Sequence, residues 1–289
     1  MPSDRARGGV NDLVIDGEAD VQEEWARKAG TKSAGGERRQ LVWIGASALF
    51  LLVLLGAVAS VVSPETYGSY DPSAGNLSPN LALPGDARWR YLLGTDSQGH
   101  SILMWVAFGA RLSLLVPFVS ALVACAIGLL LTRLEEAGER LRYVITFLID
   151  LIAILPALLL LCILLVYGVG SSVWLSILLF ALISCPWQRG RLSGATRARE
   201  AAHFMQRVMT VTASLIVMQA GIDFLGFGLQ PALVTWGDAL RHCTDYMASG
   251  NWWWPFFPGV AITWGSVSAA ILARGLAPIG ERYAETPPG

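Results

Sequence analysis

Residues 41–62 read LVWIGASALFLLVLLGAVASVV, and no charged side chain interrupts them. At about 1.5 Å per residue, a helix of this length spans the roughly 30 Å hydrocarbon core of a bilayer. Ala57 and Ala59 form the small-residue pattern of a signal-peptide cleavage site, but the apolar run is too long, and the polar segment before it too extended, for a signal peptide. We therefore predict a transmembrane helix over residues 41–62.

Five further apolar runs follow the first one, at residues 112–132, 143–167, 171–187, 208–226 and 252–273. Backbone groups in lipid must find hydrogen-bond partners within their own segment, and these runs are continuous rather than alternating, which favours helices over the strands of a barrel. The whole chain is 54% hydrophobic and 15% charged, against about 25% charged residues in ordinary soluble proteins. The predicted fold is an all-α polytopic membrane bundle with six transmembrane helices.

The arginines of the short loops predict the orientation of the bundle. Loops rich in Lys and Arg lie preferentially in the cytoplasm, and the two sides of this chain differ clearly. One side holds Arg38, Arg39, Arg133, Arg140, Arg142, five arginines in residues 189–207, Arg274 and Arg282, whereas the other holds Arg88, Arg90, Arg111 and Arg241. We predict that the first side, and with it both termini, is cytoplasmic.

The predicted spans divide the chain into parts of different character. Residues 1–40 mix charged side chains and glycine, cannot bury enough surface to offset the entropy of ordering, and form a disordered cytoplasmic tail. Residues 63–111 form an extracytoplasmic loop whose amphipathic end, residues 97–111, suits a helix lying at the membrane interface. A transmembrane core over residues 112–283 and a short tail over residues 284–289 complete the chain.

The sequence lacks the residues that several classes of function require. A net charge of −1 gives no basic surface for nucleic acid. The nearest P-loop-like string, GTKS at residues 30–33, lacks the glycine spacing and the preceding strand of a nucleotide site. Cysteines 125, 162, 185 and 243 show no metal-ligand spacing, so we predict neither a metal site nor a cofactor. A hydrolase built on His242, Cys243 and Asp245 is an alternative, although adjacent loop residues lack the geometry of a catalytic triad.

Ionisable and polar groups inside the predicted spans are candidates for a solute path. A charged side chain at the centre of a membrane helix costs about 2.5–3.5 kcal/mol on insertion scales, so it faces protein or water and marks function by default. Asp150 lies well inside the third span, and Pro156 is expected to kink the same helix. Gln219 and Asp223 lie in the fifth span. Pore-lining, structural and proton-coupling roles for Asp150 all remain open.

An ordered set of motifs resembles one family. Leu93-Gly94-Thr95-Asp96 is followed by Gly99 and by Gly109-Ala110-Arg111-Leu112-Ser113-Leu114; the Asp150 and Pro156 pair, Gly226, Gly228, Gln230, Pro231, Trp236, Gly237 and Phe257-Pro258-Gly259 come later in the chain. In this order and spacing they resemble the second permease subunit of dipeptide, oligopeptide and nickel ABC importers. The resemblance extends from about residue 41 to residue 283.

The resemblance implies half of a solute channel. It implies a homologous permease as partner, two cytoplasmic ATPase subunits that bind the ATP, and an extracytoplasmic solute-binding protein that delivers a peptide or related small solute. It also implies a multi-pass protein of the bacterial cytoplasmic membrane that is not itself an enzyme.

A cytoplasmic loop after the fourth span carries the contact with the ATPase in this family. The resemblance places that contact at Arg199-Glu200-Ala201-Ala202, on a helix expected over residues 196–206. Two features depart from the family: Gln206 stands where a glycine is expected, and the stretch between Pro186 and Phe224 is short, which leaves no room for a second helix in the loop. The alternative to a working importer subunit is therefore a degenerate, non-transporting structural or regulatory subunit.

Overall fold

The computed structural model describes residues 36–59, 61, 74–79, 91–154, 172–188, 197–227, 234–241 and 247–277. Within these ranges every regular element is a helix, and the only strand-like pairing there is an isolated bridge between Thr95 and Ser101. The prediction of an all-α fold is confirmed for the described part of the chain.

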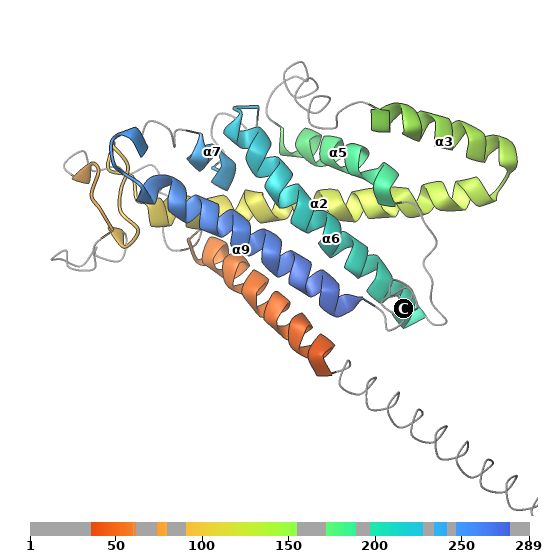
Figure 1. Ribbon diagram of the computed structural model, residues 1–289, viewed down its shortest axis with the longest axis horizontal. Helices are drawn as coiled ribbons and strands as arrows, with labels where there is room; N and C mark the ends of the chain where they lie inside the picture. The colour runs from red at the N-terminus through yellow and green to blue at the C-terminus, as the bar shows by residue number, and fades with distance from the viewer. Residues whose placement is uncertain are drawn as a thin grey trace, which may run out of the picture.

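The described helices form one bundle. The N-terminal helix, Gly36–Ala59, is followed by α2 (Ile102–Glu136), α3 (Glu139–Ile154), α5 (Val173–Ser184), the 3-10 turn η3 (Cys185–Gln188), α6 (Arg197–Phe224), α7 (Trp236–Leu240) and α9 (Trp253–Leu276). Figure 1 shows α2 and α3 as a long hairpin, with α6 and α9 packed side by side across α2. The N-terminal helix runs along α9 on the outside of the bundle.

Three of these helices are long and apolar enough to cross a membrane: Gly36–Ala59, α2 and α9. The segment Val173–Gln188 is apolar but shorter. The described part of the predicted third span is helical as far as Ile154, and α6 contains most of the predicted fifth span. A membrane helical bundle is therefore supported, whereas the number of six spans and the cytoplasmic location of the termini remain predictions.

The interfacial helix predicted for residues 97–111 is not a separate element. Helix α2 begins at Ile102, where the Ser101 hydroxyl caps it by accepting a hydrogen bond from the Met104 N–H at 3.4 Å, and it continues without interruption to Glu136. At 35 residues, or about 52 Å by helical rise, α2 is longer than a bilayer core. The amphipathic pattern of its first turns reflects partial burial by other helices rather than a change of direction.

The start of the N-terminal helix also differs from the prediction. The helix begins at Gly36, inside the segment expected to be disordered. Glu37, Arg38, Arg39 and Gln40 are good helix formers, so the helix extends beyond its apolar run. Residues 1–35 and the predicted tail over residues 284–289 lie outside the described residues.

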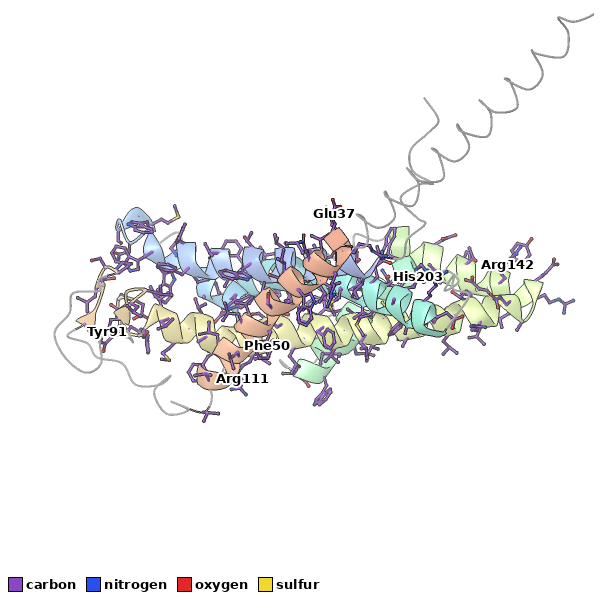
Figure 2. The ribbon with its side chains drawn as sticks, turned by 90° about the horizontal axis from the view of Figure 1, so that it is seen from below. Glu37, Phe50, Tyr91, Arg111, Arg142 and His203 are labelled. Atoms are coloured by element: carbon purple, nitrogen blue, oxygen red, sulfur yellow. The ribbon has the colours of Figure 1, made fainter. Side chains whose placement is uncertain are left out.

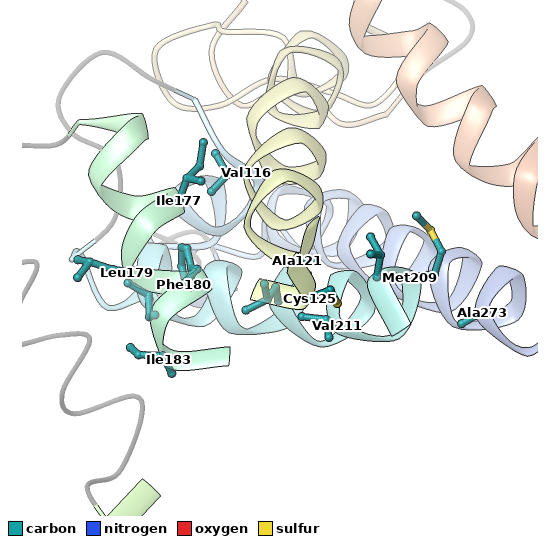
Figure 3. Close-up of a cluster of buried hydrophobic side chains, with 13 residues drawn as sticks. Val116, Ala121, Cys125, Ile177, Leu179, Phe180, Ile183, Met209, Val211 and Ala273 are labelled. Carbon is teal, nitrogen blue, oxygen red and sulfur yellow. The ribbon is translucent and has the colours of Figure 1, made fainter. Parts of the chain in front are cut away.

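A hydrophobic cluster joins α2, α5, α6 and α9 (Figure 3). Val116 and Cys125 of α2, Phe180 of α5 and Val208 of α6 are each at most 2% exposed. Large apolar side chains on the outer surface, such as Trp43 and Phe50 of the N-terminal helix, are 66% and 65% exposed. Such a surface is expected for a bundle whose outer solvent is lipid.

Two glycines bring the N-terminal helix into backbone contact with α9. A methyl group at Gly45 would lie 2.6 Å from the Leu272 nitrogen, and one at Gly275 would lie 2.8 Å from the Val42 nitrogen. Small residues at helix crossings permit this close approach, which is the main source of helix association in membranes. The N-terminal helix is therefore packed onto the bundle and is not a loose anchor.

Candidate functional site

The segment Gly94–Ser101 forms a tight turn before α2. Gly94 and Gly99 have φ angles of +85° and +87°, in the left-handed region that glycine adopts without strain. The Asp96 carboxylate organises the turn: Oδ1 accepts hydrogen bonds from the Gln98 and His100 backbone N–H groups at 2.9 and 2.7 Å, and Oδ2 lies 2.8 Å from His100 Nδ1. The predicted signature residues Gly94, Thr95, Asp96 and Gly99 are thus brought together as one turn.

This turn is the point where distant segments meet. The Thr95 hydroxyl donates a hydrogen bond to the Ala74 carbonyl at 2.5 Å and accepts one from the Leu77 N–H at 2.8 Å. The Thr95 carbonyl accepts a hydrogen bond from the Trp253 indole N–H at 3.3 Å, at the start of α9. The Gly94–Ser101 turn therefore connects α2, α9 and residues 74–79 at one end of the bundle.

We expect Asp96→Ala to destabilise the turn. The change removes one acceptor for two backbone N–H groups and the partner of His100, and the loss of these bonds costs about 2 kcal/mol. Asp96→Asn keeps an oxygen at the Oδ1 position and is the matched control, with less than half the loss. Thermal unfolding midpoints in mild detergent measure both changes. Equal midpoints for wild type and Asp96→Ala would contradict the role of the carboxylate.

A second cluster surrounds Trp236, which is fully buried. Its backbone N–H donates to the Ser113 hydroxyl at 3.0 Å, and its indole N–H donates to the Val106 carbonyl at 2.8 Å. Thr235 caps α7 by accepting a hydrogen bond from the Asp238 N–H. The short helix α7 is therefore attached to the side of α2 by both the main chain and the side chain of one tryptophan.

Glycines permit the close approach of α7 to α2, α6 and α9. A methyl group at Gly109 of α2 would lie 2.8 Å from Trp236 Cδ1, and one at Gly265 of α9 would lie 3.3 Å from Trp236 Cζ3. A methyl group at Gly237 would collide with the Ala220 carbonyl oxygen of α6. We call this contact, formed by Gly109, Ser113, Ala220, Trp236, Gly237 and Gly265, the Trp236 junction.

The polar pair predicted in the fifth span lies next to this junction. Gln219 and Asp223 are one turn apart on α6 and only 2% and 4% exposed. A methyl group at Gly237 would lie 2.7 Å from Asp223 Cβ, which places Asp223 against α7. Among the described residues, neither amide atom of Gln219 has a hydrogen-bond partner. A buried polar group without a hydrogen bond costs about 1–3 kcal/mol of folding free energy, so stability does not explain why a glutamine stands at position 219.

Asp150 is not part of this cluster. It is exposed and lies on α3, a helix that packs against α2, whereas Gln219 and Asp223 lie where α6 meets α2, α7 and α9. Pro156 lies outside the described residues, as do Gly228, Gln230 and Pro231. Two further signature residues of α2 have different environments. Ala110 is buried, whereas Arg111 is exposed, and a methyl group at Gly56 of the N-terminal helix would lie 3.2 Å from Arg111 Cγ.

The segment Arg199–Ala202 lies in the first turns of α6. Arg199 and Ala201 are exposed, and Glu200 and Ala202 are partly exposed. The helix expected to end at Gln206 continues without a break to Phe224, because residues 203–210 are helix-compatible and contain neither glycine nor proline. Figure 2 shows His203 on the side of the bundle nearer Arg142, away from Tyr91 at the other end. The Arg199–Ala202 segment and the Trp236 junction therefore lie at opposite ends of α6, because the junction contacts this helix at Ala220.

Several residues of the site carry weak signals in the sequence. Arg207 Nη1 donates to the Gln188 carbonyl at 3.4 Å and so holds the end of η3 against α6. Arg241 lies against Gly226, which ends α6 with a φ of +84°. Only the cap of α7 follows a recognisable pattern, Thr235 with Asp238 three residues later. The other contacts join segments far apart in the chain, which no local pattern identifies.

No metal centre is present among the described residues, since no three His, Cys, Asp or Glu side chains gather there. Cys125 and Cys185 are buried free cysteines, as their apolar surroundings predict. Cys162 and the alternative catalytic group of His242, Cys243 and Asp245 lie outside the described residues. The described part of the site is thus made of packed glycines, a buried tryptophan and buried polar groups.

Comparison with known proteins agrees with these motifs. The chain is 28% identical to a di/tripeptide transport system permease protein of Pseudomonas aeruginosa, over 89% of this chain and 90% of that protein. It is 29% identical to a peptide permease protein of Brucella suis, over 80% of this chain and 85% of that protein. Over most of its length, the chain is therefore similar to bacterial peptide-transport permeases.

A third permease is similar to a slightly lower extent. A D,D-dipeptide transport system permease protein of Escherichia coli is 26% identical over 78% of this chain and 83% of that protein. No protein-family model matches the chain. The similarity to these permeases and the apolar helices agree on an integral membrane protein.

Proposed function

We propose that the chain is the permease subunit of an ABC importer for peptides or related small solutes in the bacterial cytoplasmic membrane. It forms half of the translocation pathway with a homologous permease, receives solute from an extracytoplasmic binding protein, and is driven by two cytoplasmic ATPases that bind the ATP. The observation that carries this proposal is similarity to a di/tripeptide transport permease over 89% of the chain. Similarity of that extent includes both ends of the bundle.

Two features of the structure support the proposal. Gln219 is buried without a described partner, and Asp223 lies one turn away, as expected where a helix contributes polar groups to a pathway. The Arg199–Ala202 segment is accessible at the opposite end of the same helix, as a contact with a soluble subunit requires. Proton coupling through Asp150 has no support from the packing, because the acid is not brought to the buried pair.

The second candidate function is a non-transporting structural or regulatory subunit of such a complex. The continuity of α6 favours it, since residues 197–224 leave no separate helix to dock on an ATPase. Reconstitution of the chain with a partner permease, ATPases and binding protein in liposomes separates the two functions. Solute uptake and ATP hydrolysis stimulated by the binding protein are expected of an importer, whereas assembly without any stimulation would leave only the structural role.

We expect Glu200→Ala to reduce stimulated ATP hydrolysis and uptake in these liposomes about tenfold. A charged contact that is lost at an interface costs about 1.4 kcal/mol or more, which corresponds to this factor. Glu139→Ala is the matched control, because Glu139 is an exposed glutamate in the first turn of α3. Equal activity of the two variants would remove Glu200 from the ATPase contact.

A further inference from the structure

The segment assigned to the ATPase contact and the buried polar pair belong to one uninterrupted helix. From Glu200 to Gln219, α6 rises about 28 Å. Within α6, glycine occurs only at Gly221, between Gln219 and Asp223, and proline does not occur. The helix therefore has no glycine or proline hinge between Glu200 and Gln219.

The middle of α6 is held by its neighbours. Val208 is fully buried in the cluster shared with α2 and α5, and Arg207 is bonded to the Gln188 carbonyl. On the other face, the Ser266 hydroxyl of α9 donates to the Ala213 carbonyl at 3.0 Å. These contacts lie between the Arg199–Ala202 segment and the Gln219 and Asp223 pair. The middle of α6 can therefore serve as a pivot about which both ends move together.

The far end of α6 is in direct backbone contact with α7. A methyl group at Gly237 would collide with the Ala220 carbonyl oxygen and would lie 2.7 Å from Asp223 Cβ. Packed backbone cannot give way as a flexible side chain does, because protein interiors are close-packed and have low compressibility. Displacement of α6 at this end must therefore displace α7 and the Trp236 junction.

We propose that α6 is a one-piece lever, which carries movement of Arg199–Ala202 directly to Gln219, Asp223 and α7. The inference rests on the proposed function, since it requires an ATPase that moves the first turn. It also accounts for the short loop: residues 197–224 form one helix with no separate docking helix among them, so the stiffness of α6 provides the connection. The required property is continuity of the helix over residues 203–207, where the exposed turn meets the supported part.

The test replaces Met205 and Gln206 by a glycine pair or by an alanine pair. Both double variants remove the same two partly exposed side chains, but glycine weakens the helix by about 1 kcal/mol per position relative to alanine. In the reconstituted complex, the glycine pair is expected to retain stimulated ATP hydrolysis while uptake per ATP falls at least tenfold. The alanine pair is expected to keep at least half of the wild-type ratio.

Three results would overturn the lever. They are a glycine pair with the wild-type ratio of uptake to hydrolysis, equal losses in both double variants, and rapid amide hydrogen exchange at residues 203–207 in the assembled wild-type complex. The hydrogen-exchange measurement needs no variant, so it tests the continuity of α6 even if the variant with the glycine pair does not fold. Absence of stimulated hydrolysis in the wild-type complex is a different outcome, because it refutes the proposed function together with the lever.

Discussion

Trp236→Ala is expected to lower the thermal unfolding midpoint more than any other single truncation of a tryptophan in the described bundle. The side chain is completely buried, contacts α2 and α9, and donates a hydrogen bond to the Val106 carbonyl. Removal of such a ring leaves a cavity and costs about 3–5 kcal/mol. Trp236→Phe retains much of the volume and loses the hydrogen bond, so an intermediate midpoint is expected.

Trp174→Ala is the control for this change, because Trp174 is 77% exposed on α5. All variants are made in a background with Cys162→Ser and Cys243→Ser, since these two cysteines lie outside the described residues. A fluorogenic maleimide then reports the transition, because Cys125 and Cys185 are buried and become reactive when the bundle opens. The expected order of midpoints is wild type and Trp174→Ala together, then Trp236→Phe, then Trp236→Ala. If the two alanine variants unfold at the same temperature, Trp236 does not hold the helices together.

Gly237→Ala is the second change with a large expected effect. The added methyl group meets a backbone carbonyl, that of Ala220, which cannot rotate away. Helix α7 must then separate from α6, at a cost of about 3 kcal/mol, the upper part of the range for overpacked sites. Uptake by the reconstituted complex is expected to fall with stability, because the Trp236 junction loses its contact with α6.

Gly221→Ala provides a close comparison, because Gly221 lies two residues before Asp223 on the same helix. No atom lies within 4 Å of the methyl group it would add, so the change is expected to be neutral or to stabilise α6 by up to about 1 kcal/mol. The maleimide assay measures both glycine variants under identical conditions. A midpoint for Gly237→Ala at or above that for Gly221→Ala would show that α7 is not in tight contact with α6.

The apolar runs were sufficient to predict most of the described helices. The runs at residues 41–62, 112–132 and 252–273 correspond to the long apolar helices Gly36–Ala59, α2 and α9, because length and hydrophobicity are properties of the segment alone. Helix ends were harder to predict. The first turns of α2 and the N-terminal part of α6 are polar or amphipathic, so their sequences do not distinguish a continuing helix from a separate one.

The site was predictable only in part. Gln219 and Asp223 were identified because a polar side chain in an apolar helix is conspicuous, and both are buried. Asp150 gave the same signal but lies exposed on α3, since a single sequence does not say which helices become neighbours. The contacts of Trp236 with Val106 and Ser113 join residues 130 and 123 positions apart, and only the folded bundle displays them.

The Gly94–Ser101 turn has a consequence for how the protein is made. Thr95 meets Trp253, a residue 158 positions later in the chain. At about 5–20 residues per second, a ribosome needs roughly 8–30 s to synthesise that interval. Until this interval is complete, the turn lacks its contact with α9. Nascent chains halted before residue 253 do not contain the Trp253 indole N–H that donates to the Thr95 carbonyl, so the turn is completed only when α9 begins to be made.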